Sequence, residues 1–338
     1  MNLPFMPTII EHAAFLIGQT PSAAARDAYL MAEAHIEAYK LYRADVVTVG
    51  MDIYNIEAEA LGCRIRFYED ASIPGILTHP INLDCDTGRI AFSPKLGRIQ
   101  LLLDAAMRVK NAIGHKVHVS VGICGPFSIL IELLGFEAAI HAFVDEDRRV
   151  VPLLGALLEF QKDYCSAITA HGLGVVVFES WASPPLISPE VYRTYALPYE
   201  QELLAHLQSL GVPVRPLIIG GDTRPILDDI LETGTTLLVS DYNTPLPLYI
   251  EKARSKDLSL RANIDPKLVY QGAWDEIDTR VKEICEGRTY PKLIVGTGVV
   301  PYDTPVENLL RVKEMLKAHC ASTRLTLSHD NPSCLCGL

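Results

Sequence analysis

The sequence predicts a single (β/α)8 barrel, the TIM-barrel form of the α/β class, and three observations support this prediction. Short runs rich in β-branched residues alternate with longer amphipathic runs along the whole chain. No Pro- or Ser-rich linker divides the repeats into separate domains. A doubly wound sheet is the alternative, but neither a GxGxxG after a first strand nor a GxxxxGK[ST] occurs.

Seven segments have the near-continuous apolar character of parallel strands that are buried on both faces. They are residues 44–52, 116–125, 174–180, 213–221, 235–241, 258–265 and 292–298. A closed barrel needs an eighth strand. We expect it in the weaker 62–95 segment or near the C terminus.

Helical periodicity fills the intervals between these segments. Residues 22–41 carry apolar side chains at helical spacing, with Thr20 or Ser22 as the expected N-cap. Residues 189–211 begin with proline and end at glycine, and 223–234 repeat this pattern. We therefore expect one barrel domain over residues 1–325, with an N-terminal helical extension, and a polar tail over residues 326–338.

The composition excludes several classes of protein. Hydrophobic residues make up 49% of the 338 and charged residues 21%, which excludes a disordered chain. The net charge of −11 argues against a nucleic-acid partner. The N terminus lacks the pattern of a secretory signal, and the most apolar stretch is interrupted by Gly, Pro and Glu. We expect a cytoplasmic protein that does not cross a membrane, and the sequence leaves open whether it is a homodimer.

Polar residues at the ends of the predicted strands are the candidates for a site, because barrel enzymes place their chemistry at this face. Asp222 and Asp265 begin helices and are expected to be caps. Other strand-end residues precede loop segments, which favours a catalytic role, and nearby polar and aromatic residues could bind substrate. The catalytic candidates are Asp52, Glu179, Asp241 and Asn263, and the substrate-binding candidates are Tyr54, Asn55 and Trp181.

Five strings occur in an order that resembles one superfamily. They are IEAEALGCRIRFYEDASIP (56–74), GICGPFSILIELLG (122–135), LISPEVYRTYALPYEQEL (186–203), GGDTRPIL (220–227) and ANIDP (262–266). The chain resembles the uroporphyrinogen decarboxylase superfamily, and within it the corrinoid-dependent methyltransferases. The resemblance covers roughly residues 8 to 320 and implies a (β/α)8 barrel. The arginine-rich signature of the decarboxylase itself is missing, since residues 1–43 hold only Arg26 and Arg43.

The resemblance also implies a zinc site, and here the chain departs from the family pattern. The coenzyme M enzymes of this branch carry zinc on a His-x-Cys and a later Cys. The matching positions here are Ile218, Gly220 and Gly298, and none of these side chains can coordinate zinc.

Zinc-competent residues lie elsewhere in the sequence. Cys124 ends a strand, Cys85 lies in a loop that leads toward that strand, and Glu57 follows the end of the first strand predicted above. The aromatic ether demethylases of this branch resemble the chain in using differently spaced acid and cysteine ligands. We therefore predict zinc on Glu57, Cys85 and Cys124, although a buried free cysteine is commonly just a small hydrophobe.

The resulting hypothesis is a methyltransferase that moves the methyl group of a methoxylated aromatic to Co(I) of a separate corrinoid protein. Zinc would polarise the ether oxygen. The corrinoid must come from a partner, because the chain shows no DxHxxG signature. Methylated amines, coenzyme M or a folate are alternative small-molecule donors or acceptors, and a barrel without catalysis is the alternative of another class.

Overall fold

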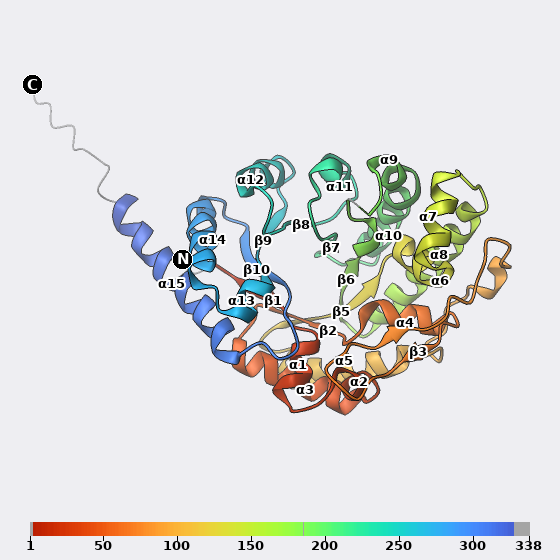
Figure 1. The fold of residues 1–338 in the computed structure, drawn as a ribbon, viewed down its shortest axis with the longest axis horizontal. Coiled ribbons are helices and arrows are strands. Elements are labelled where there is room, and N and C mark those ends of the chain that lie inside the picture. The colour runs from red at the N-terminus through yellow and green to blue at the C-terminus, as the bar shows by residue number, and fades with distance from the viewer. Residues whose placement is uncertain (1–2, 185, 328–338) are drawn as a thin grey trace, which may run out of the picture.

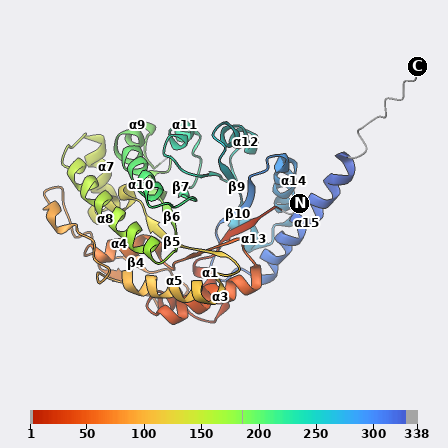
Figure 2. The ribbon, with the colours of Figure 1, turned by 180° about the vertical axis from the view of Figure 1, so that it is seen from behind.

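The computed structural model describes residues 3–184 and 186–327 and shows an eight-stranded parallel barrel inside a layer of helices (Figures 1 and 2). The strands form two four-stranded sheets, in the orders β1-β10-β9-β8 and β2-β5-β6-β7, and every neighbouring pair within them is parallel. The barrel strands are β1 (Phe5–Thr8), β2 (Val46–Val49), β5 (His118–Cys124), β6 (Gly174–Phe178), β7 (Leu217–Ile218), β8 (Leu237–Ser240), β9 (Ser259–Ile264) and β10 (Leu293–Val299). The predicted fold class is confirmed.

Hydrogen bonds at the amino ends of the strands join the two sheets at both seams. Phe5 N donates to Asp45 Oδ2 at 2.7 Å, and Asp45 N donates to Phe5 O at 3.2 Å, which ties β1 to β2. At the other seam, Arg215 N donates to Thr236 Oγ1 at 2.7 Å, and Thr236 N donates to Arg215 O. The two half-barrels therefore close into one ring.

The eighth strand lies where the sequence did not suggest it. Residues 5–8 form β1 and pair with β10, so both expected locations were wrong and the chain begins with a barrel strand before its first helix. The 62–95 segment instead holds a two-stranded antiparallel hairpin of β3 (Ile65–Arg66) and β4 (Gly75–Ile76) outside the barrel. The segment FMPT is only four residues long and contains a proline, so its sequence pattern did not indicate a strand.

Fifteen α-helices occur within the described residues. They are α1 (Glu11–Leu16), α2 (Pro21–Ala25), α3 (Ala28–Tyr42), α4 (Ile53–Ala60), α5 (Ile99–Ile113), α6 (Pro126–Leu134), α7 (Phe136–Val144), α8 (Val150–Ala170), α9 (Pro189–Val191), α10 (Leu197–Ser209), α11 (Leu227–Leu231), α12 (Leu246–Ser255), α13 (Pro266–Gln271), α14 (Trp274–Glu286) and α15 (Val306–Leu327). The predicted tail at 326–338 lies almost entirely outside the described residues.

Two predicted helices are interrupted for local reasons. The 22–41 helix divides into α2 and α3, because the Asp27 side chain accepts from Tyr29 N and Leu30 N and so caps a second helix. Thr20 caps α2 as expected. The 189–211 helix contains a π-helical turn over Tyr192–Ala196, just before Pro198, whose ring and missing N–H disturb regular helical bonding.

An apolar plug fills the middle of the barrel. It consists of Ile10, Ile53, Val176, Phe178, Ile218, Leu237 and Val239, which form a buried cluster separate from the main core between strands and helices. The plug divides the barrel interior into a mouth at the carboxyl ends of the strands and a lumen at their amino ends.

In the described part of the chain, no single helix combines the length and apolar character needed to span a membrane. The bent pair α6 and α7 meets those criteria only when its two helices are taken together.

Candidate active site at the carboxyl ends of the strands

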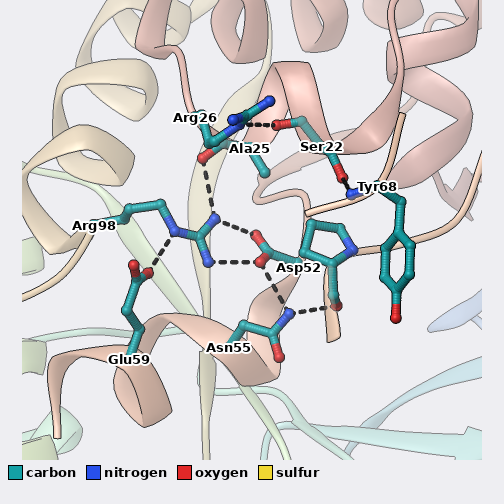
Figure 3. Close-up of polar contacts among 9 residues, drawn as sticks. Ser22, Ala25, Arg26, Asp52, Asn55, Glu59, Tyr68 and Arg98 are labelled. Atoms are coloured by element: carbon teal, nitrogen blue, oxygen red, sulfur yellow. Dashed lines mark hydrogen bonds and ion pairs between the residues drawn. The ribbon is translucent and has the colours of Figure 1, made fainter. Parts of the chain in front are cut away.

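Arg98, which precedes α5, organises the mouth beside β2 (Figure 3). Its guanidinium binds both oxygens of Asp52, Nη1 to Oδ1 at 2.8 Å and Nη2 to Oδ2 at 2.7 Å. Nε donates to Glu59 Oε2 at 2.5 Å and Nη1 to Ala25 O at 3.1 Å. All three guanidinium nitrogens, Nε, Nη1 and Nη2, therefore donate, and the four bonds hold the side chain in one orientation. Arg98 thus links α2, α4 and the end of β2.

Asp52 and Asn55 belong to this network rather than to an open site. Asn55 Nδ2 donates to Asp52 Oδ2 at 3.0 Å and to Pro74 O at 2.6 Å, which ties the hairpin segment to α4. Asp52 is only 4% exposed and Asn55 6%. Both side chains are therefore held by protein partners, and the catalytic role of Asp52 and the substrate-binding role of Asn55 stay predictions. A single arginine directly before the 99–113 helix was the signal that could have indicated this network.

Glu57 and Cys124 are brought together as predicted. Cys124 N donates to Glu57 Oε1 at 2.8 Å, and Gln161 of α8 donates to the same oxygen at 3.2 Å and to Cys124 O. Glu57 Oε2 is buried with no hydrogen-bond partner among the described residues. Burial raises the pKa of Glu57 to about 7, and burial together with neighbouring Glu57 raises the pKa of the Cys124 thiol.

Cys85 does not join this pair. Its turn contacts the carboxyl end of α6, where Ile81 N donates to Leu133 O, and its thiol faces Asp86 O. Cys124 precedes the amino end of the same helix, and a helix of this length separates its ends by roughly 13 Å. Within residues 3–184 and 186–327, no three His, Cys, Asp or Glu side chains gather as metal ligands. The predicted three-ligand zinc site is therefore not assembled, and the residues present fit only two of its positions.

Glu179 lies in the core behind the mouth. Its carboxylate accepts from Phe127 N and Ser128 N, at the amino end of α6, and from Ser128 Oγ at 2.8 Å. A Cβ at Gly125 would lie 1.7 Å from Glu179 Oε1, so only glycine leaves room for this acid. Burial raises the pKa of Glu179 well above its usual range. Glu179 thus caps α6 and carries a proton near neutral pH.

The two aromatic candidates line the mouth above these acids. Tyr54 Oη bonds to Ser180, donating to its hydroxyl and accepting from its N–H at 3.0 Å. Trp181 Nε1 donates to Glu132 Oε1 at 2.7 Å, and its ring packs against Phe136 at a centroid distance of 5.1 Å. Their polar atoms are held by protein partners, so a substrate would meet the apolar faces of the rings.

Asp241 and Asn263 lie on the opposite side of the mouth. Asp241 accepts from Gly221 N at 2.7 Å and from Tyr242 N at 2.6 Å, which fixes the loop after β7. Asn263 Oδ1 accepts from Arg261 Nε at 3.1 Å inside the barrel. Asp265 caps α13 through Lys267 N, as the sequence predicted. The structure therefore divides the predicted site into two groups, one on each sheet.

Comparison with known protein families gives one match over nearly the whole chain. The family model for uroporphyrinogen decarboxylase (URO-D) matches residues 2–319.

Among individual proteins, two kinds of relative occur at similar identity. Methylcobamide:CoM methyltransferase MtbA of Methanosarcina mazei is 28% identical over 299 residues, which cover 84% of this chain and 86% of the relative. A uroporphyrinogen decarboxylase of Chlorobium phaeovibrioides is 25% identical over 86% of this chain and 85% of its own. A methylated-thiol–coenzyme M methyltransferase of Methanosarcina mazei is 25% identical over 84% of this chain and 75% of its own.

Solved structures support the fold. A methyltransferase from Methanosarcina mazei superimposes with a TM-score of 0.79 at 21% identity, covering 96% of this chain and 94% of that one. A B12-independent methionine synthase from Shewanella sp. W3-18-1 reaches a TM-score of 0.55 at 11% identity, over 97% of this chain and 98% of that one.

Proposed function

Because the chain belongs to the uroporphyrinogen decarboxylase family, we propose that it is a corrinoid-dependent methyltransferase that reacts at the carboxyl-terminal mouth of its barrel. The observation that carries this proposal is the similarity to methylcobamide:CoM methyltransferases over 84% of the chain. The corrinoid would be carried by a partner protein that docks on the mouth loops.

The charge of the mouth argues against porphyrin decarboxylation. A substrate with many carboxylates needs several free arginine forks. Three arginines beside the strand ends pair with acids of the protein: Arg98 with Asp52, Arg224 with Asp222 and Arg280 with Glu283. Few cations would remain to hold a porphyrin, although decarboxylases are relatives of similar identity.

The methyl acceptor or donor is the finer question. Relatives that act on coenzyme M support a thiol as the small-molecule partner better than the aromatic ether expected from the sequence. The chain nevertheless departs from the zinc pattern, since Ile218 belongs to the apolar plug and Gly220 and Gly298 have no side chain. We therefore propose the broader activity and keep zinc as a prediction that rests on Glu57 and Cys124.

The residues of the mouth suggest how the chain itself would assist the reaction. A methyl donor that leaves as an anion must take up a proton. Glu57, with its pKa raised to about 7 by burial, would hold a proton near neutral pH when no zinc is bound to it. The faces of Tyr54 and Trp181 would position an apolar donor. With such a donor, Co(I) on the partner would take the methyl group as its bond to the donor breaks; with a thiol acceptor the methyl group would leave the cobalt for the sulfur, and the thiol would give up its proton.

The test is a matched set of assays with the purified chain. Free cob(I)alamin is incubated with methoxylated aromatics or methylated amines, and methylcob(III)alamin with coenzyme M, while the corrinoid absorption spectrum is followed. We expect one of these pairs to react faster than without protein. Background rates with every pair, together with carbon dioxide release from uroporphyrinogen, would replace this proposal with decarboxylation.

A further inference from the structure

A cavity of 660 Å³ occupies the lumen of the barrel below the apolar plug. Phe178, Ile218 and Leu237 of the plug form its roof, and Val46, Val176 and Ile294 contribute to its wall. Segments that precede strands, including Pro213–Pro216 and Lys256–Leu258, line its other end, and Val214 there is 55% exposed. The volume falls in the range of small-molecule sites, about 300–1,000 Å³.

Polar side chains project into this apolar space, and glycines on neighbouring strands leave room for them. A Cβ at Gly296 would lie 2.7 Å from Arg261 Cδ. A Cβ at Gly174 would lie 2.3 Å from His118 Nε2 and 2.5 Å from Ser120 Oγ. Arg261, His118 and Ser120 all line the cavity. The two glycines, Gly174 and Gly296, thus leave space in the lumen for these polar side chains.

Arg261 is the charged residue at the centre of the barrel. Its Nε donates to Asn263 Oδ1 at 3.1 Å, and it forms no ion pair within the described residues. Burial lowers the pKa of Arg261 to about 10, although nearby Asp241 opposes this effect. Arg261 is partly buried, and a cation held away from bulk water without an anion is destabilising, which a bound anion would offset.

The entrance to the cavity is also cationic. Arg215, Lys256 and Lys292 line it, and Asp257 is the one acid among the described lining residues. Lys256 and Lys292 pair with Glu232 and Asp257. Arg215 Nη1 bonds only to the carbonyls of Val212 and Pro213, and its Nε is buried without a partner among the described residues. This gathering of cations in a chain of net charge −11 would attract an anion.

We propose that the lumen binds a small organic acid, with its apolar body against the aliphatic wall and its carboxylate paired with the guanidinium of Arg261. The ligand enters from the amino-terminal end of the barrel, past Arg215. This site is separate from the mouth, because the plug lies between them.

Isothermal titration of the full chain with decanoate and with decan-1-ol tests the proposal. The two probes share their apolar body and differ in charge. We expect decanoate to bind at least tenfold more tightly than the alcohol. Arg261→Met should remove most of this difference, whereas Arg254→Met, an exposed arginine outside the lining residues, should leave it unchanged. Thermal melts of each variant establish that it is folded.

Two further variants locate the bound acid. Ser259→Trp fills the lumen at the start of β9 and should abolish binding, whereas Gly220→Trp, at the mouth, should not. Decanoate binding that survives both Arg261→Met and Ser259→Trp would overturn the proposal. Absence of carboxylate binding to the wild-type chain at millimolar concentration would overturn it equally.

Discussion

The two four-stranded sheets of the barrel place their polar strand-end residues in different surroundings. On the β2-β5-β6-β7 sheet, Asp52 and Glu179 enter the core and are fully bonded to Arg98 and to the start of α6. On the β1-β10-β9-β8 sheet, Arg261 lines the lumen and donates to Asn263, and the Asp241 carboxylate accepts only from backbone N–H groups. The first sheet therefore uses its charges to fix helices around the mouth, while the second leaves a cation without an anionic partner.

The largest expected difference is between Cys124→Ala and Cys85→Ala, in their zinc content and their methyl-transfer activity. If Glu57 and Cys124 hold zinc on the first sheet, Cys124→Ala should lose nearly all bound zinc and methyl transfer. Cys85→Ala is the matched control and should retain both, because Cys85 lies at the far end of α6. Elemental analysis gives the zinc content of the wild type, Cys124→Ala and Cys85→Ala, and the corrinoid assay gives their methyl-transfer rates. Equal loss from both variants would restore the three-ligand site predicted from the sequence.

Removal of Arg98 should destabilise the first sheet strongly. Arg98→Met leaves the 4%-exposed Asp52 carboxylate without its cation, which typically costs about 3–5 kcal/mol. Arg149→Met breaks exposed pairs with Asp147 and Asp84 and should have a much smaller effect, because solvent screens such pairs. Urea unfolding gives both free energies. A small cost for Arg98→Met would mean that the network does not hold the mouth together.

The stability of the fold should also depend on pH through His35, which contacts the end of β2. His35 is buried and bonds Gly50, and burial lowers its pKa from 6.5 to about 4. Between pH 6.5 and 4, His35 is protonated in the unfolded state but neutral in the folded state. The free energy of unfolding therefore falls as the pH drops from 6.5 toward 4. The loss should reach roughly 3 kcal/mol. His35→Gln should flatten this dependence, and the exposed His141→Gln should not; parallel curves for wild type and His35→Gln would contradict the assignment.

The smallest effect is expected at a helix cap on the second sheet. Asp265 accepts from Lys267 N at the start of α13. Asp265→Ala should lower the free energy of unfolding by about 1 kcal/mol, and Asp265→Ser should restore most of it. Thermal unfolding measures both variants. A much larger loss would show that Asp265 does more than cap the helix.

The sequence predicted the architecture well because buried parallel strands leave a continuous apolar signal. It missed β1, since four residues containing a proline carry too weak a pattern. At the site, the proximity of Glu57 and Cys124 was predictable from their positions at strand ends. The partners of Asp52 and Glu179 were not, because Arg98 and Ser128 lie 46 and 51 residues away from them in the sequence. A strand-end carboxylate looks the same in sequence whether it faces a substrate or a helix terminus.

The rate of corrinoid methylation in a variant whose mouth is filled would show whether the reaction takes place at the mouth. A Cβ at Gly220 meets no atom within 4 Å, so Gly220→Trp can occupy the mouth without disturbing the core. Gly155→Trp, at an equally open position on α8, is the control. We expect Gly220→Trp to abolish methyl transfer and Gly155→Trp to keep the wild-type rate. Undiminished transfer by a folded Gly220→Trp protein would contradict a reaction at the mouth.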